Sequence, residues 1–175
     1  MYAGHIGIAL GAKGLRDTVP LWVLVVASQL PDWTDVALCT AGVRMPVFGM
    51  LSHSLPAVAV LAALAGLLTF SVMREPFASL LVAGVVVSHA LADYVTGFKP
   101  TWPGGPLIGL GIYRQPSVDF AIEATVIFGG WLLYRASFQE ELRSSRRVAA
   151  VLAAALAFQL AADIVFATTT GLRKC

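Results

Sequence analysis

The chain has 175 residues, of which 58% are hydrophobic and 13% are charged, whereas charged residues make up about 25% of an ordinary soluble protein. This composition excludes a disordered chain and a coiled coil, and the net charge of +2 excludes a basic nucleic-acid-binding protein. Two cysteines, Cys39 and Cys175, are too few for a disulfide framework or a cysteine zinc site. We therefore predict one membrane-embedded domain, residues 1–175, folded as an all-α, polytopic bundle of about five to six helices, one or two of them short.

Apolar stretches predict the helices in chain order: 2–12, 18–30, 47–72, 77–96, 117–134 and 148–170. The first two are shorter than the ~20 residues needed to cross a bilayer. Because Pro31 lacks an N–H, the second helix is expected to end there, ~10 Å short of the far surface at 1.5 Å per residue. Irregular backbone at that depth is tolerated only inside protein or beside a cavity, which is a first indication of a site.

Alternating helix directions sort the loops onto two faces of the membrane. Face A receives loops 13–17, 73–76 and 135–147, and face B receives 31–46, 97–116 and the C-terminus. Face A carries seven of the twelve Lys and Arg residues, against five on face B. The positive-inside rule then predicts that face A is cytoplasmic. The chain is thus expected to be a multi-pass inner-membrane protein with its site near the extracytoplasmic face.

Ionisable side chains concentrate in the half of the bundle next to face B. They are six of the ten acids and all three histidines: Asp32, Asp35, Asp93, Asp119, Glu123, Asp163, His5, His53 and His89. A charge in the apolar layer costs at least ~2.5–3.5 kcal/mol, so such groups pair, face a cavity or bind an ion. Basic partners near this face are few (Arg44, Lys99 and Arg114), and bound divalent metal ions would supply the missing positive charge.

Two i, i+4 pairs support a metal site. His89 and Asp93 form one pair, Asp119 and Glu123 form the other, and this spacing places both members on one helix face. Imidazole together with carboxylate suits zinc, with manganese or iron as alternatives. The competing interpretation of any single pair is a structural hydrogen bond inside the bundle.

Short motifs then carry a resemblance to a known family. They are Gly4-His5, Leu30-Pro31-Asp32, Leu51-Ser52-His53-Ser54-Leu55, Ser88-His89-Ala90-Leu91-Ala92-Asp93-Tyr94-Val95-Thr96 and Trp102-Pro103. In this order they resemble the LexA-binding, inner-membrane-associated metal-dependent hydrolases. The order of ligands is also similar, more distantly, to the zinc-dependent phospholipase C and P1 nuclease group. The chain departs from these patterns at Thr34, Phe48 and Lys99, so one or two metal ions are expected, not three.

The resemblance implies a site and a reaction. Its ligands would be His5, Asp32, His53, His89, Asp93, Asp119 and Glu123, and whichever of Asp32 and Asp35 is not a ligand would be the general base. A metal-activated water would hydrolyse a phosphoester or another ester bond, and Lys99 and Arg114 would hold an anionic head group. Because the site lies below the membrane surface, a lipid or lipid-linked substrate is expected.

Two other classes of function remain open at this stage. Intramembrane carboxylates also carry protons or metal ions in transporters and channels, although the sequence shows no inverted repeat. A non-catalytic scaffold stabilised by metal is the third possibility. Metal content, turnover and ion flux distinguish the three.

Overall fold

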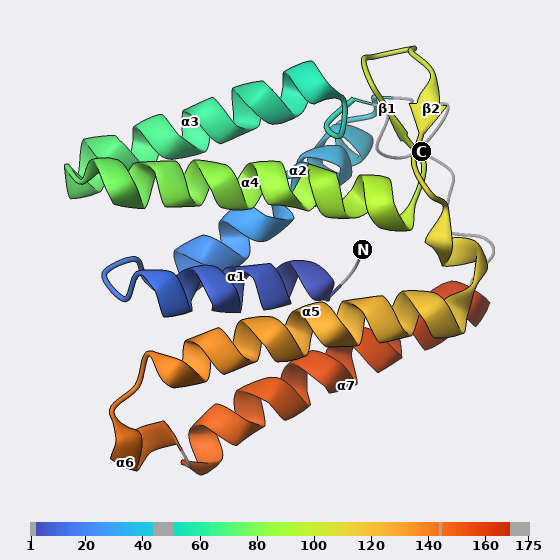
Figure 1. Ribbon diagram of the computed structural model, residues 1–175. Helices are drawn as coiled ribbons and strands as arrows, with labels where there is room; N and C mark the ends of the chain where they lie inside the picture. The colour runs from blue at the N-terminus through green and yellow to red at the C-terminus, as the bar shows by residue number, and fades with distance from the viewer. Residues whose placement is uncertain (1–2, 44–50, 144, 169–175) are drawn as a thin grey trace.

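The computed structural model describes residues 3–43, 51–143 and 145–168 and has the predicted all-α architecture (Figure 1). In the described part, six helices have at least twelve residues and α6 is a single turn. The bounds are α1 Gly4–Leu15, α2 Leu21–Thr40, α3 Leu55–Met73, α4 Pro76–Thr96, α5 Pro116–Ala136, α6 Glu140–Arg143 and α7 Arg146–Thr168. Predictions that concern Cys175, Arg44, Phe48 or the side chain of Asp163 lie outside the described residues.

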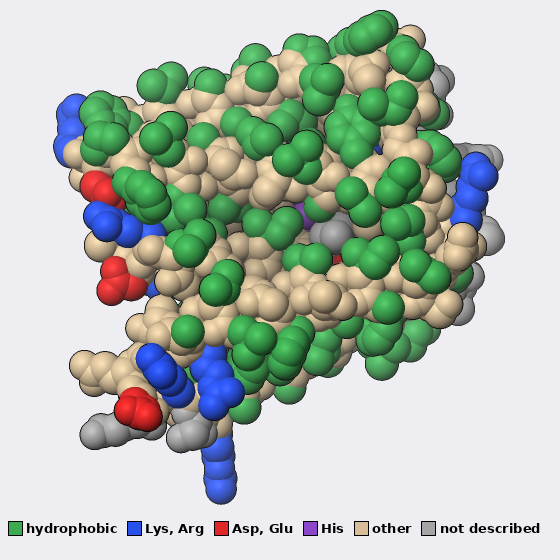
Figure 2. Space-filling view, viewed as in Figure 1, with side chains coloured by type: hydrophobic (Ala, Val, Ile, Leu, Met, Phe, Trp, Pro, Cys, Tyr) green, Lys and Arg blue, Asp and Glu red, His purple; other side chains and the backbone are tan. Residues whose placement is uncertain are grey.

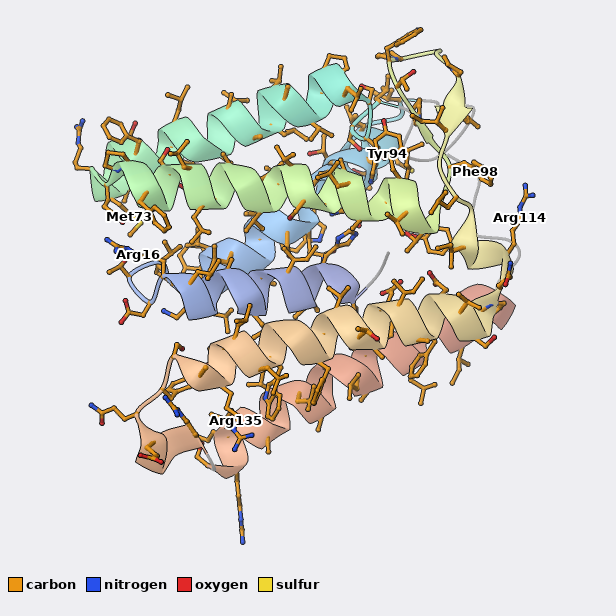
Figure 3. All side chains as sticks on the ribbon, viewed as in Figure 1. Arg16, Met73, Tyr94, Phe98, Arg114 and Arg135 are labelled. Carbon is orange, nitrogen blue, oxygen red and sulfur yellow. The ribbon has the colours of Figure 1, made fainter. Side chains whose placement is uncertain are left out.

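The long helices run lengthwise and alternate in direction, as the loops predicted (Figure 1). Arg16 and Met73 lie at one end of the bundle, and Phe98 and Arg114 lie at the other (Figure 3). At the first end, which corresponds to face A, Arg16 Nη2 lies 2.8 Å from Glu75 Oε1, and charged side chains gather there in Figure 2. The long flanks between the two ends are mostly covered by hydrophobic side chains in that view.

Among the described residues, three helices are long and apolar enough to cross a membrane: α3, α4 and α5. Each of them has a proline in its first turn, a position where the missing N–H would have no partner in any case and where the fixed φ favours the helix. The predicted span at 148–170 corresponds to α7, which is not among these three. The structure therefore supports a membrane-embedded bundle, with α1 and α2 packed beside the candidate spans.

The prediction that α2 ends at Pro31 was wrong. The helix continues through this proline to Thr40. A proline inside a membrane helix is tolerated when other groups satisfy the backbone around it. Here His89 of α4 donates from Nδ1 to the carbonyl of Ser28 at 2.7 Å, within one turn of Pro31. The continued helix places Asp32 and Asp35 one turn apart on the same face.

Helix α1 lies in the middle of the bundle and packs very closely against α5. A Cβ atom added to Gly7 would lie only 2.6 Å from the Cα of Ile127, so the two backbones approach as small residues allow in membrane helices. On its other side, α1 contributes Ala9 and Ala12 to a core shared with α2, α3 and α4. This packing holds the fully buried His5 in the interior.

Face B is covered by the segment between α4 and α5. It contains two short antiparallel strands, β1 Lys99–Pro100 and β2 Leu107–Ile108, followed by the 3-10 turn η1 Ile112–Arg114. The hydroxyl of Tyr94 in α4 donates to the carbonyl of Pro100 at 2.9 Å, which ties β1 to the end of α4. The sequence predicted a loop here and did not predict the strand pair. The strand pair matters for the site because β1 contains Lys99 and brings it to the interior.

Candidate metal centre

Four side chains converge below face B: Asp32 of α2, His53 just before α3, and His89 and Asp93 of α4. One ligand atom from each lies within 4.8 Å of the others. His53 Nε2 is 3.1 Å from His89 Nε2, 3.2 Å from Asp32 Oδ1 and 3.1 Å from Asp93 Oδ2. His89 Nε2 is 3.8 Å from Asp32 Oδ1 and 3.7 Å from Asp93 Oδ2. We refer to these four residues as the metal cluster.

Neighbouring groups fix both imidazoles with Nε2 toward the cluster. The hydrogen bond from His89 Nδ1 to the Ser28 carbonyl requires the proton of His89 to be on Nδ1, which leaves the lone pair of Nε2 free. His53 Nδ1 lies 2.8 Å from Ser52 Oγ and 3.3 Å from Asp35 Oδ2. Such partners on the far nitrogen are what orients histidines that bind metals. Both rings therefore present an unprotonated nitrogen when they are neutral.

The ring of His53 also shows how much negative charge surrounds the cluster. Burial disfavours its imidazolium form, but hydrogen bonds to Asp32, Asp35 and Asp93 outweigh burial and raise the pKa of His53 to about 10. In the absence of a metal, one proton is thus held among three carboxylates. A divalent cation would neutralise the same carboxylates and would have to displace that proton.

Asp93 also contacts two side chains outside the cluster, Lys99 and His5. Its Oδ2 lies 2.8 Å from Lys99 Nζ, and its Oδ1 lies 3.2 Å from His5 Nε2. The ring of His5 stacks on that of His89, with centroids 3.8 Å apart. His5 therefore lies beside the cluster, in contact with one ligand residue and one ligand ring, without belonging to the group of four.

The donor set fits a divalent transition metal. Nitrogen and oxygen ligands ~2.0–2.2 Å from a tetrahedral zinc ion lie ~3.3–3.6 Å from each other, and five of the six distances within the cluster are between 3.1 and 3.8 Å. Two imidazole nitrogens and two carboxylates suit zinc, manganese or iron. Three of the four side chains are at most 1% exposed, whereas that of Asp32 is 31% exposed. Asp32 is therefore the member that solvent or substrate reaches first.

The structure places the other predicted site residues elsewhere. Glu123 accepts a hydrogen bond at Oε2 from the backbone N–H of Gly4, 3.0 Å away, and neither it nor Asp119 belongs to the metal cluster. Asp35 lies behind His53, and Arg114 stacks over the ring of Phe98 at 5.0 Å. Their predicted roles as ligands, base and head-group residue stay predictions.

Sequence reasoning missed two groups that orient the ligands. The Ser28 carbonyl belongs to the backbone and carries no residue-type signal. Ser52 reads in the sequence as a small packing or hydrogen-bonding residue, and a contact with its neighbour His53 is not expected because sequence neighbours on a helix do not face each other. It lies in a turn before α3, where that rule does not apply. A turn assignment for 51–54 would have made its contact with His53 Nδ1 predictable.

An all-α bundle with candidate membrane-spanning helices and a buried histidine–aspartate cluster is the architecture of a membrane protein with a candidate metal centre. The model of the YdjM inner membrane protein family matches residues 2–170, so the chain belongs to this family. No curated protein and no solved structure shows a significant match. Membership confirms the resemblance to an inner-membrane family, while the hydrolytic activity that the resemblance implies stays a prediction.

Proposed function

We propose that the protein is a membrane-embedded, metal-dependent hydrolase that acts on a phosphoester or another ester bond of a lipid or lipid-linked substrate. The observation that carries this proposal is the metal cluster: two oriented imidazoles and two carboxylates with ligand atoms within 4.8 Å. Ionisable groups inside a membrane protein are costly and are usually retained for function. Lys99 Nζ contacts one of the two carboxylates of the metal cluster, that of Asp93, at 2.8 Å.

Metal chemistry explains why these residue types suit hydrolysis. A divalent metal held by Asp32, His53, His89 and Asp93 would lower the pKa of a water molecule towards neutrality and would polarise the phosphoryl or acyl oxygen. Hydrolysis transfers the hydroxyl group of water to phosphorus or carbon, and the leaving oxygen takes a proton. The site must therefore both accept and return a proton.

Each neighbouring residue has a distinct task in this proposal. Asp32 contacts both histidines through Oδ1, and its partly exposed carboxylate can accept the proton of the attacking water at Oδ2. Asp35 and Ser52 keep His53 Nδ1 occupied, so Asp35 is a positioning residue. The ammonium group of Lys99 lies against Asp93 and can bind an anionic oxygen of the substrate.

Elemental analysis of detergent-purified protein tests the proposal. We expect stoichiometric zinc or manganese in the wild type, loss of the metal in His53→Ala and His89→Ala, and retention in Glu140→Gln, which removes an exposed carboxylate on face A. Hydrolysis of phospholipids and of soluble phosphodiesters should disappear together with the metal. A metal-free wild type would overturn the proposal.

The same samples distinguish the alternative functions. Metal without turnover, but with ion flux in liposomes, would indicate a transporter. Loss of stability in His89→Ala, with no turnover to lose in the wild type, would indicate a scaffold. Cleavage of soluble phosphodiesters but of no lipid would retain the hydrolase and reject the lipid substrate.

A further inference from the structure

The segment between α4 and α5 is apolar although it lies outside the long helices. Residues 100–113 contain no Asp, Glu, Lys, Arg or His, and the cations Lys99 and Arg114 flank them. Most of this stretch consists of the strand pair β1–β2 and the turns beside it. We call residues 98–111 the face-B hairpin. A surface loop in water usually carries clusters of polar residues, so the composition of the hairpin calls for another environment.

The large apolar side chains of the hairpin are not buried within the chain. Trp102 is 57% exposed, Leu107 and Ile108 are each 48% exposed, and Leu110 is 72% exposed. These four residues all lie between positions 102 and 110. Exposed apolar side chains that gather in this way mark surfaces that contact a membrane or another protein.

Backbone hydrogen bonds attach the hairpin to the ends of two candidate membrane spans. The N–H of Leu55, the first residue of α3, donates to the carbonyl of Thr101 at 3.0 Å. The N–H of Leu110 donates to the carbonyl of Tyr94, in the last turn of α4, at 3.0 Å. Figure 1 shows the strand pair beside these two helix ends. The hairpin is therefore fixed at the depth at which α3 and α4 leave the apolar layer.

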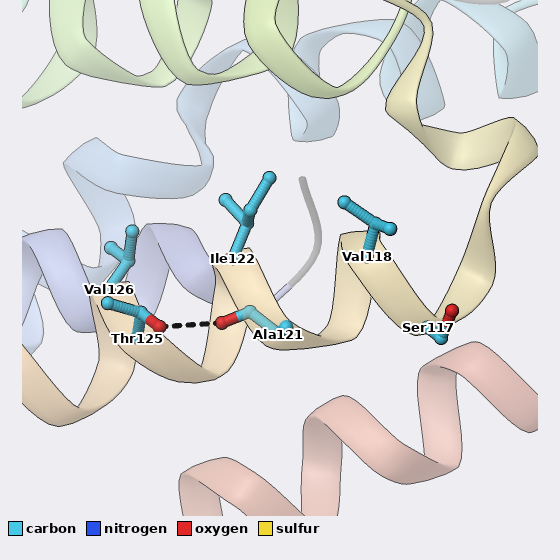
Figure 4. A pocket seen from close by; sticks show the side chains of 6 residues that line it. All are labelled: Ser117, Val118, Ala121, Ile122, Thr125 and Val126. Atoms are coloured by element: carbon cyan, nitrogen blue, oxygen red, sulfur yellow. Dashed lines mark hydrogen bonds between the residues drawn. The ribbon is translucent and has the colours of Figure 1, made fainter.

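The apolar surface of the candidate spans continues up to the hairpin. Leu55 at the start of α3 and Val95 near the end of α4 are both exposed. Beyond the hairpin, Val118 and Ile122 line a shallow apolar surface on the first turns of α5 (Figure 4). Because α3, α4 and α5 are candidate spans in a chain of an inner-membrane family, lipid covers this surface, and the hairpin extends it.

Backbone structure and side-chain type place the hairpin in the head-group region of the bilayer and not in its hydrocarbon core. An irregular backbone cannot satisfy all of its N–H and C=O groups as a helix does, which the core does not tolerate where lipid is the neighbour. Tryptophan is enriched at the membrane–water interface, and Trp102 is the most exposed aromatic side chain of the hairpin. The exposed Arg114, whose guanidinium lies over the ring of Phe98 at 5.0 Å, suits lipid phosphates.

We propose that the face-B hairpin inserts into the head-group region of the face-B leaflet, with its exposed apolar side chains in contact with lipid. This anchor requires neither a metal ion nor turnover, so it stands apart from the proposed function. It has a consequence for the metal cluster. Because β1 carries Lys99, whose Nζ contacts Asp93, the inserted hairpin holds the cluster at a fixed depth just below the head groups.

Tryptophan quenching by brominated lipids tests the depth of the hairpin. Leu110→Trp adds a fluorophore at an exposed position of the full-length protein, and the difference from the wild-type signal isolates it from the four native tryptophans. The vesicles contain phosphatidylcholine brominated either near the glycerol or near the chain ends. We expect shallow bromines to quench the new tryptophan several-fold more strongly than deep bromines. Leu64→Trp, an exposed position at the middle of α3, is the matched control and should show the opposite order.

Trp102→Phe provides a second measurement if Leu110→Trp does not fold. The fluorescence lost in this variant should be the part of the wild-type signal that shallow bromines quench. Quenching of the Leu110→Trp signal by acrylamide in water but by neither lipid would overturn the proposal, since the hairpin would then lie in solvent. Quenching in the same order as Leu64→Trp, or by no quencher at all, would also overturn it, because the hairpin would then lie in the hydrocarbon core or against another protein.

Discussion

The pairs on α4 and α5 have the same spacing but different surroundings. His89 and Asp93 are buried, as are Asp119 and Glu123, and each pair lies on one face of its helix. On α4 the pair meets His53 and Asp32 and completes a group of possible ligands. On α5 the pair lies outside that group. Spacing thus predicts which side chains share a face, but the packing of neighbouring helices decides what that face meets.

The pair on α5 differs from the pair on α4 because its member Glu123 contacts the N-terminal end of α1. The first N–H groups of a helix have no partner within it. The carboxylate of Glu123 accepts a hydrogen bond from one of them, the backbone N–H of Gly4. The amide oxygen of Gln159 accepts from the N–H of Ala3 at 2.9 Å. A negative charge at this position also interacts favourably with the helix dipole. Glu123 is therefore used to anchor α1, which in turn holds His5 beside the cluster.

Removing a ligand on α4 should have the largest effect on metal binding. We expect His89→Ala and Asp93→Ala to weaken zinc binding by at least ~100-fold, since the loss of even an orienting partner of a ligand costs 10–100-fold. Isothermal titration of detergent-solubilised protein measures this. Glu123→Gln on α5 removes a carboxylate that is outside the metal cluster and should leave the zinc affinity unchanged. If the variants on α4 and on α5 lost zinc affinity equally, the claim that only the α4 pair binds metal would be wrong.

A smaller effect is expected behind His53. Asp35→Asn keeps the size of the side chain but removes the charge that faces His53 Nδ1, so zinc affinity should fall by ~10–100-fold. The zinc-to-protein stoichiometry at saturation should stay that of the wild type, because no ligand is lost. A reduced stoichiometry would mean that Asp35 is itself a ligand.

The pH dependence of metal binding should reflect the proton on His53. Its pKa of about 10 means that the metal-free site is protonated at neutral pH, and metal binding must release this proton. Affinity should therefore rise with pH, by about tenfold per unit below that pKa for the one proton. Titrations in buffers with different ionisation enthalpies count the released protons. Binding without proton release between about pH 6 and 8 would contradict the assigned charge state.

The mildest change expected for metal binding is at Glu123. Glu123→Ala leaves the buried N–H of Gly4 without its acceptor, which should lower the free energy of unfolding by about 1–3 kcal/mol. Denaturant or thermal unfolding in detergent measures this, and zinc affinity serves as the internal control. A variant with unchanged stability but lost metal would show that Glu123 is a ligand and that the α5 pair belongs to the site.

Sequence reasoning succeeded where a local rule determines the outcome. The apolar stretches predicted the all-α bundle, and the i, i+4 rule predicted that His89 and Asp93 share a face. It failed at Pro31, because a proline inside a membrane helix is tolerated and does not always end the helix. The position of Lys99 beside Asp93 depends on the strand pair that follows α4, and no spacing rule predicts such a contact. Extending α2 past Pro31 would have revealed Asp32 and Asp35 as an i, i+3 pair.

X-ray absorption at the zinc edge tests the metal cluster most directly. In zinc-loaded wild-type protein we predict nitrogen and oxygen ligands with the outer-shell scattering of two imidazoles, those of His53 and His89. The spectrum should keep one imidazole in His89→Ala, at a zinc concentration that still fills the site, and should be unchanged in Glu123→Gln. Bound zinc without imidazole scattering, or a spectrum that changes in Glu123→Gln and not in His89→Ala, would contradict the assignment of the site.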